Sequence, residues 1–270
     1  MPTKSPAPRS GAAGKSPPKG IQSVEIGCEM LMHLSRSRQP ASLTLLAAEL
    51  AMSPSKAYFY LTSLVRSGLV SRDDAGLYKL GRAAREIGFA ALSQIDAIDE
   101  AREAMVRIQR DIDQSINMSV WGTAGPTVVH RLPAPYWRLE IRLGAVLSPL
   151  TATGRSLLTG FPESVVSEII RDALAKATSA DPWRQFSQKK AMSIFLEDRE
   201  RGLSRGFGSV FPGATSLAAP FRDQNGNTVA AITIQGEGER FDTSYDGPVA
   251  KALLAAVSPA TPPHVTVPDT

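Results

Sequence analysis

The sequence is poor in the residues that most often mark redox and metal proteins. It contains one cysteine, Cys28, three histidines and only 6% aromatic residues. A single cysteine cannot form an internal disulfide, and the apolar neighbours of Cys28 favour a packed thiol over a reactive one. A lone imidazole in a strand, such as His130, is more often structural than catalytic. The composition therefore gives no support to disulfide or histidine-based chemistry.

The motifs of common enzyme classes are missing as well. The sequence has no zinc-ligand cluster, Walker loop or nucleophile elbow. The glycine-rich stretch "GFGSVFPG" (206–213) lacks the dinucleotide-binding spacing after a strand. We therefore expect no catalytic residue, no metal and no cofactor, and an enzyme that processes a small molecule is a less favoured alternative.

Long apolar runs are absent too. No segment holds 18 uncharged apolar residues, and the first 20 residues have no apolar run of the length that an export signal needs. Residues 1–20 combine prolines with glycine, serine and lysine, which predicts a disordered basic tail. We expect a cytoplasmic protein without a membrane partner.

Charge is distributed unevenly along the chain. Residues 1–90 hold 12 Lys and Arg against 6 Asp and Glu, a net charge of +6, and the remainder holds 18 against 20, a net charge of −2. A basic cluster favours a polyanionic partner, because neutralising phosphates releases condensed counterions. Four of the twelve cations lie in the N-terminal tail, so a tail that only aids solubility explains the composition equally well.

The first folded segment predicts three helices. The first covers 23–35, the second begins after the N-cap Ser42, and the third runs from Pro54, behind the N-cap Ser53, to about Arg66. Gly68 suits the left-handed residue that ends a helix. The expected apolar face of the first helix consists of Val24, Ile26, Cys28, Leu31 and Leu34.

Two helices joined by a tight turn match a helix-turn-helix, in which the second helix enters the major groove. The apolar residues at helical spacing on the third helix are Ala57, Tyr60, Leu61 and Leu64. The residues left facing outward, which we expect at the groove, are Ser55, Lys56, Phe59, Thr62 and Ser63. Strands at 69–72 and 77–80 predict a hairpin, the wing of a winged helix-turn-helix. Arg72 and Lys79 on this hairpin are placed to reach phosphates.

Beyond the hairpin, residues 82–113 have helical periodicity and predict a linker helix, which carries dimer contacts or packs on its own chain. The following strands are expected at 116–122, 127–133, 216–223 and 227–236, with Asn225-Gly226 as a hairpin turn. Helices are expected at 154–160, 163–177, 187–202 and 244–257. This mixture predicts an α+β sheet covered by helices.

The segment "LGAVLSPLTATGRSLLTGF" (143–161) contains a second candidate site. Residues 151–153 precede a helix that Gly154 and Arg155 open, so free backbone N–H groups there are able to receive an anion such as a carboxylate. A plain N-cap explains the same residues without a ligand. The stretch alone leaves both interpretations open.

Several of these stretches resemble the IclR family of bacterial transcription regulators, over roughly residues 21–257. The similar stretches are "MSPSKAYFYLTSL" (52–64), "RSGLV" (66–70), "LYKLG" (77–81) and "TATGRSLL" (151–158). The resemblance implies an N-terminal winged helix-turn-helix (21–81), a linker helix (82–113) and a C-terminal GAF-like α+β effector-binding domain (114–257), with tails at 1–20 and 258–270. The outward His-Arg pair of the family's reading helix is Tyr58-Phe59 here. An aromatic ring thus replaces an arginine able to contact DNA, and we expect this ring to contact a thymine methyl or a sugar.

The resemblance also implies an effector site. Relatives that bind small organic acids use this turn, a polar residue before "LAAP" and alternate residues of the last strand, which carry over to Ala152, Thr153, Ser216, Thr233 and Gln235. Val210 lies near a position that is often acidic in the family, and Ser216 replaces a common cysteine. Because Val210 stands where a charge is common and Phe211 adds an apolar ring, we expect a less polar effector, such as an aromatic or longer aliphatic acid.

Together these features predict a ligand-responsive transcription regulator that binds double-stranded DNA. Two-fold symmetry of a homodimer or homotetramer would require a pseudo-palindromic operator with paired half-sites. The effector is expected to be a small organic acid. The alternative from a different class is a sensor or adaptor that acts through protein contacts alone.

Overall fold

The structure is a computed structural model that describes residues 20–37, 39–94, 97–134, 141–206 and 213–258. The chain divides into two compact units, residues 1–84 and 85–270, and each is described by itself. Within the described ranges, no helix combines the length and apolar character that crossing a membrane requires.

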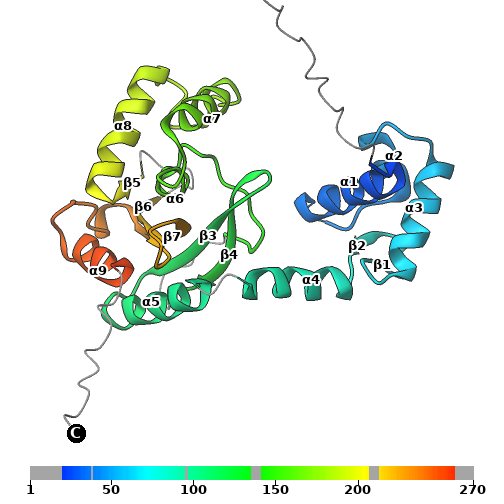
Figure 1. Cartoon of the computed structure of the whole chain (residues 1–270), viewed down its shortest axis with the longest axis horizontal. Helices are drawn as coiled ribbons and strands as arrows, with labels where there is room; N and C mark the ends of the chain where they lie inside the picture. The colour runs from blue at the N-terminus through cyan, green and yellow to red at the C-terminus, as the bar shows by residue number, and fades with distance from the viewer. Residues whose placement is uncertain (1–19, 38, 95–96, 135–140, 207–212, 259–270) are drawn as a thin grey trace, which may run out of the picture. The chain divides into compact units, whose positions relative to one another are not determined.

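The N-terminal unit packs three helices against a small hairpin (Figure 1). Its elements are α1 (Gln22–Arg36), α2 (Leu43–Glu49), α3 (Pro54–Arg66), β1 (Val70–Arg72) and β2 (Tyr78–Leu80). Met30, Leu46 and Leu61 are completely buried at the centre, one from each helix. The antiparallel register pairs Val70 with Leu80, which confirms the predicted wing.

Local sequence sets both ends of α3 as predicted. The Ser53 Oγ accepts a hydrogen bond from the backbone N–H of Lys56 at 3.3 Å, and Pro54 occupies the first helical position. At the other end Gly68 has a φ of 72°, the left-handed conformation in which a side chain would be strained. These signals fix where α3 begins and ends.

The predicted apolar face of α1 is only partly correct. Met30 and Leu34 are buried, whereas Cys28 and Val24 are exposed. The reason is that α1 carries two apolar stripes, and the one through Met30 and Leu34 faces the core. The expectation of a packed Cys28 thiol is therefore wrong.

The C-terminal unit is built on an antiparallel five-stranded sheet with the order β4-β3-β7-β6-β5. The strands are β3 (Ser115–Gly122), β4 (Gly125–Leu132), β5 (Ser204–Arg205), β6 (Ala214–Arg222) and β7 (Thr228–Glu237). The turn between β6 and β7 has Gly226 at a φ of 82°, as the Asn-Gly signal predicted. The two-residue strand β5 was not predicted, because so short a segment has no periodicity.

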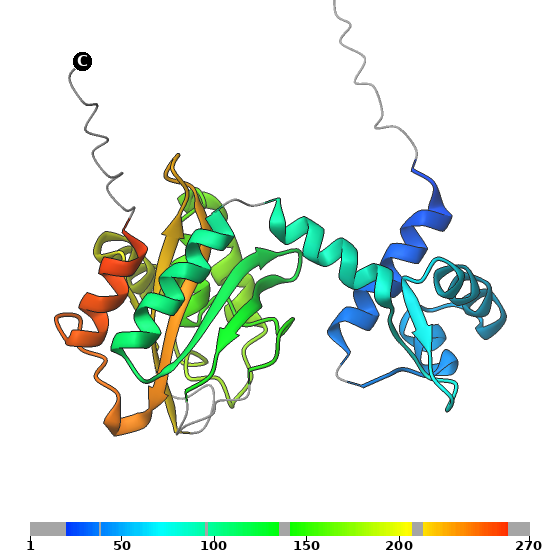
Figure 2. The same cartoon turned by 90° about the horizontal axis from the view of Figure 1, so that it is seen from below.

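Helices cover both faces of this sheet (Figures 1 and 2). On one face lie α5 (Ala97–Asp111) and α9 (Pro248–Val257), which bury an apolar core with Met105, Ile116 and Ile232 at its centre. On the other face lies α6 (Ala152–Leu158), and α7 (Glu163–Ala175) and α8 (Gln188–Arg201) form a second apolar cluster around Phe195. A short 3₁₀ helix, η1 (Gly238–Arg240), follows β7.

The single linker helix predicted over 82–113 differs from the structure. Two helices replace it, α4 (Arg82–Ser93) and α5, with residues 95–96 between them outside the described part. α4 has no buried residue, whereas α5 buries six, including Ile98, Met105 and Ile108. Periodicity alone did not distinguish α5, which packs in the core, from α4, which has no buried residue.

Candidate DNA-binding surface and effector site

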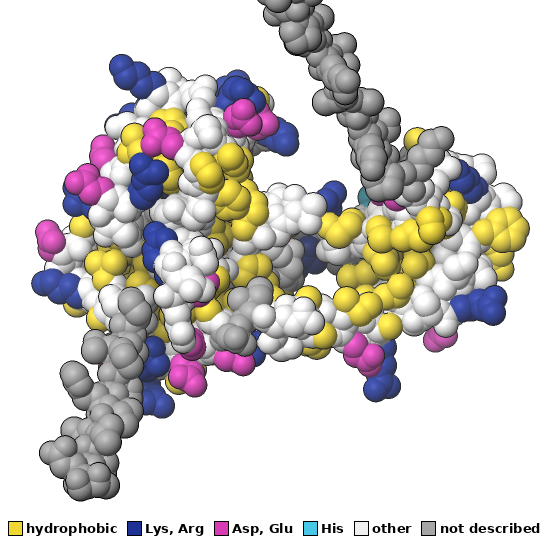
Figure 3. All heavy atoms as spheres, in the orientation of Figure 1, with side chains coloured by type: hydrophobic (Ala, Val, Ile, Leu, Met, Phe, Trp, Pro, Cys, Tyr) yellow, Lys and Arg dark blue, Asp and Glu magenta, His cyan; other side chains and the backbone are white. Residues whose placement is uncertain are grey.

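The outer face of α3 presents two aromatic rings to solvent. Phe59 is 68% exposed and Tyr58 is 49% exposed. Their rings meet edge to face with centroids 6.1 Å apart. Figure 3 shows hydrophobic side chains on the visible surface around α3. An exposed aromatic pair on a helix with a separate buried face is typical of a contact surface.

Cations flank these rings. Lys56, Arg66 and Lys79 are exposed, and no carboxylate of the described residues lies within 4.0 Å of their charged groups. The Ser55, Phe59 and Arg66 positions follow one helical stripe at spacings of four and seven. Tyr58 and Arg66 were not among the predicted site residues, although Tyr58 lies beside Phe59 and Arg66 lies two turns further along the same side of α3.

The remaining predicted DNA-contact residues are partly engaged within the fold. The Thr62 hydroxyl donates to the Tyr58 carbonyl at 2.8 Å, and the Ser63 hydroxyl donates to the Phe59 carbonyl at 3.0 Å. Because both hydroxyl hydrogens are already donated, the Thr62 and Ser63 oxygens are left as acceptors. They are therefore better suited to bind an amino group of a base than a phosphate. Arg72 donates from Nε to the Gly76 carbonyl and lies over the Tyr78 ring, so the hairpin itself orients its guanidinium.

The second candidate site lies where α6 covers the C-terminal sheet. The strand register aligns polar residues on that face, because Gln235 pairs with both Ser115 and Ser216, and Thr233 pairs with Asn117. The members of this polar row are Ser115, Asn117 and Ser119 on β3, Thr233 and Gln235 on β7, and Ser216 on β6. All except the half-buried Ser216 are buried, and none is ionisable.

Two of the predicted effector residues meet directly in this layer. The hydroxyls of Thr153 on α6 and Thr233 on β7 form a buried hydrogen bond of 2.8 Å. Ala152 is buried beside Thr153 at the start of α6. The predicted opening of α6 at Gly154 and Arg155 is two residues late, because Thr151 is the N-cap and its hydroxyl accepts from the Gly154 N–H at 3.0 Å. The plain N-cap interpretation thus accounts for Thr151.

The structure brings further predicted residues into this layer, leaves one outside its described part and adds a residue that was not predicted. The register brings Ser216 beside Gln235, and Val210 lies outside the described residues. Sequence reasoning missed Asn117, which is 2% exposed and has no hydrogen-bond partner for Nδ2 or Oδ1 in the described part of the chain. A polar residue among apolar strand neighbours in "SINMSV" was the available signal.

Arg155 holds the turn before α6 in place. Its Nε donates to Asp198 Oδ2 on α8 at 2.6 Å, and its two terminal nitrogens donate to the carbonyls of Leu150 and Arg205. Both side chains of the ion pair are almost completely buried. Burial raises the pKa of Asp198, and the Arg155 guanidinium opposes that shift. The pair connects the turn with α8 and β5.

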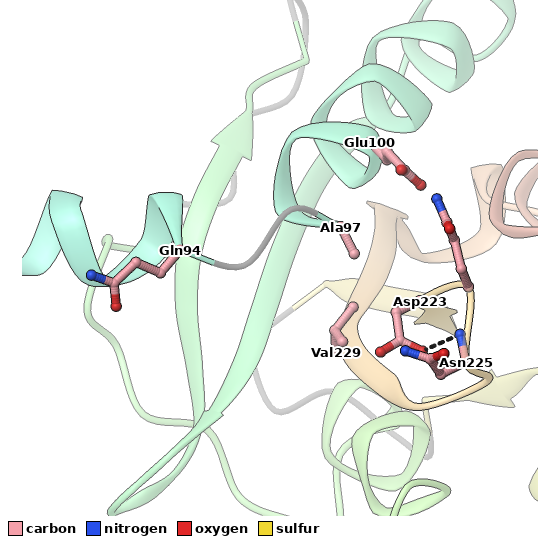
Figure 4. Close-up of a pocket in the computed structure, with 7 residues that line it drawn as sticks. Gln94, Ala97, Glu100, Asp223, Asn225 and Val229 are labelled. Carbon is pink, nitrogen blue, oxygen red and sulfur yellow. Dashed lines mark hydrogen bonds between the residues drawn. The ribbon is translucent and has the colours of Figure 1, made fainter.

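A separate open pocket of about 350 Å³ lies between the start of α5 and the β6–β7 turn (Figure 4). Glu100 and the turn residues Asp223 and Asn225 line it, and the Asn225 backbone N–H donates to Asp223 Oδ1 at 2.9 Å. Hydrogen bonds from Asn227 and Asn225 lower the pKa of Asp223. None of the predicted effector residues lines this pocket, so the two sites are distinct.

Comparison with known protein families matches both units. Residues 23–74 match the model of the IclR helix-turn-helix domain, and residues 89–260 match the model of the bacterial transcriptional regulator IclR C-terminal domain. The HTH-type transcriptional repressor AllR of Escherichia coli (strain K12) is 24% identical over 241 residues, which cover 86% of this chain and 88% of AllR.

Solved structures give the same result. Pseudomonas aeruginosa HmgR is 30% identical with a TM-score of 0.68, and the match covers 88% of this chain and 96% of HmgR. An IclR homolog from Microbacterium hydrocarbonoxydans, solved in complex with 4-hydroxybenzoate, is 17% identical with a TM-score of 0.70 over 86% of this chain and 95% of that one.

The winged helix-turn-helix and the helix-covered α+β sheet define an effector-modulated, DNA-binding transcription regulator. The chain belongs to the IclR family of bacterial transcriptional regulators. Its relatives are regulators, consistent with the expectation from the missing enzyme motifs.

Proposed function

We propose that the outer face of α3 enters the major groove of a pseudo-palindromic operator. In this arrangement Arg72 and Lys79 on the hairpin contact phosphates beside the groove. The α3 residues that face the groove are Ser55, Lys56, Phe59, Thr62 and Ser63. The observation that carries this proposal is the exposed Phe59 ring between cations that have no carboxylate partner in the described residues.

The effector of this regulator is a small organic acid, bound between α6 and the sheet by Ala152, Thr153, Ser216, Thr233 and Gln235. The Thr153–Thr233 hydrogen bond and the Ser216–Gln235 register support this site. The polar row has no charged side chain, which favours an aromatic or longer aliphatic acid over a highly charged one. A relative's complex with 4-hydroxybenzoate is in keeping with an aromatic acid.

Exposed apolar side chains on two helices suit self-association into a homodimer or homotetramer. α1 exposes Val24, Cys28 and Met32 on one face at spacings of four residues, and α4 exposes Ile87 and Phe89 on two different sides. A two-fold dimer then requires two half-sites one helical turn, or a multiple of it, apart. Light scattering of Ile87→Glu and Phe89→Glu variants should show smaller particles than the wild type.

The effector changes DNA affinity only if two arrangements of the protein bind it unequally, and α4 is the element proposed to carry this coupling. The proposed location is the cytoplasm, where bacterial operator DNA lies.

A gel shift with the DNA upstream of the protein's own gene tests the function. The wild type should shift this DNA, and footprinting should reveal two protected half-sites. An adaptor that acts through protein contacts, or an enzyme, would leave the DNA unshifted. Adding candidate acids to the shifted complex then tests modulation by an effector.

A further inference from the structure

The buried amide of Asn117 lacks the hydrogen bonds that such a group ordinarily has. Its cross-strand neighbours are already engaged, because Thr233 bonds Thr153 and the Arg131 guanidinium donates to the Ile141 carbonyl at 3.2 Å. On the same strand, Ser115 Oγ accepts from the Ala134 N–H. A buried polar group without a partner destabilises a fold by about 1–3 kcal/mol, so the Asn117 amide needs a partner from outside the chain, either water or a ligand.

Two hydroxyls of the same layer are also without a partner. The Oγ atoms of Ser119 on β3 and Ser156 on α6 are buried and make no hydrogen bond in the described residues. Ser119 lies two residues from Asn117 on the same face of the strand, about 7 Å along it. The unsatisfied groups therefore come from both walls of the layer, the sheet and α6.

We infer that Asn117 is the specificity-determining residue of the effector site and selects a 2-hydroxy acid. This inference rests on the proposed effector function of the α6–sheet layer. Oδ1 of Asn117 requires a donor and Nδ2 requires an acceptor, and both atoms sit on one carbon. The ligand must therefore present a donor and an acceptor side by side, as the hydroxyl and carboxylate of a 2-hydroxy acid do.

Keto acids and simple carboxylates lack the donor and leave Oδ1 unpaired. Arg131 lies on the edge strand β4 as the cross-strand neighbour of Asn117, and no carboxylate of the described residues pairs with it. The exposed Arg131 guanidinium lies outside the uncharged polar row and places a positive charge at its edge for the acid group, and Ser119 offers a hydrogen bond to a more distant part of the ligand.

Calorimetry of the full chain with two matched pairs of compounds tests the inference. The pairs are lactate with pyruvate and the aromatic 2-hydroxy acid mandelate with phenylacetate. The wild type should bind the hydroxy acid of at least one pair about tenfold or more tightly than its partner, because the missing donor leaves a buried acceptor unpaired. Failure of both hydroxy acids to bind would overturn the ligand class.

The Asn117→Leu variant separates a ligand-binding role from a structural one. It replaces the unpaired amide by an apolar group of similar size, so Tm should be unchanged or raised while the tenfold preference disappears. Asn225→Leu, in the exposed β6–β7 turn, is the matched control and should keep the preference. If Asn117→Leu does not fold, Asn117→Ala, which only removes atoms, takes its place.

A preference that persists without the Asn117 amide, or a lower Tm with unchanged binding, would make Asn117 a structural residue and overturn the inference. A gel shift in the same samples keeps this result separate from the proposed function. Wild-type protein that shifts DNA but binds no hydroxy acid contradicts only the inference, whereas protein that shifts no DNA contradicts the proposed regulator.

Discussion

The two units place the side chains of their proposed sites in opposite environments. On α3 of the N-terminal unit, Phe59 and Lys56 project into solvent from a helix whose other face is packed. In the C-terminal unit, Asn117, Thr153 and Thr233 are buried in a polar layer beneath α6. The contact surface of the first unit is thus separable from its stability, whereas the candidate site of the second is part of its core.

The largest effect on the free energy of unfolding is expected from breaking the buried Arg155–Asp198 ion pair of the C-terminal unit. Arg155→Met leaves Asp198 buried without its guanidinium, which should lower the free energy of unfolding by about 3–5 kcal/mol. Urea denaturation at pH 7 measures this loss. Part of it should be recovered near pH 5, because the isolated Asp198 carboxyl binds a proton and its neutral form is less costly to bury. A loss below about 1 kcal/mol would show that the pair does not hold the turn.

The Thr153–Thr233 pair should show a smaller effect with a different signature. Either Thr153→Val or Thr233→Val leaves one buried hydroxyl unpaired and should cost about 1–3 kcal/mol. The double variant removes both hydroxyls and should be close to the better single variant. A double-mutant cycle in urea measures the coupling, and strictly additive losses would argue against the hydrogen bond.

Phe59→Ala on α3 should leave stability almost unchanged and weaken DNA binding. Because the ring is exposed, the free energy of unfolding should change by less than about 0.5 kcal/mol. Operator affinity should nevertheless fall about tenfold, or ~1.4 kcal/mol. Fluorescence anisotropy with labelled DNA measures the affinity, and Phe59→Leu, which keeps an apolar contact, should recover part of it. A large loss of stability would remove the contrast between the units.

The smallest effect concerns His130 on β4. Burial and then the nearby charge of Arg102 lower its pKa below the ordinary value of 6.5. The unfolded chain therefore binds a proton before the folded chain does, so stability is complete above about pH 6.5 and falls as the pH drops below it. Tm measured across this range should decline less in His130→Gln than in the wild type. An identical decline in both proteins would assign the pH dependence to other groups.

The same contrast explains what the sequence could predict. The bounds of α3 followed from local signals, Ser53, Pro54 and Gly68, and its exposed face followed from helical spacing. Thr153 and Thr233 lie 80 positions apart, and they were assigned to one site only through resemblance to a family; their hydrogen bond was not predicted.

Asn117 was missed because nothing in its local pattern shows that its neighbours are already paired. Cys28 was misplaced for a related reason, since α1 has two apolar stripes and tertiary packing chooses between them. The break between α4 and α5 likewise depends on which residues meet the sheet, so periodicity did not reveal it.

The salt dependence of DNA binding tests the central claim most directly. Lys56→Ala and Lys190→Ala remove a lysine from the same position of two helices, since each backbone N–H donates to a serine N-cap. If α3 contacts the duplex, Lys56→Ala should weaken operator binding and reduce the slope of log K against log salt by about 1, while Lys190→Ala should match the wild type. Equal slopes for all three proteins would contradict the account.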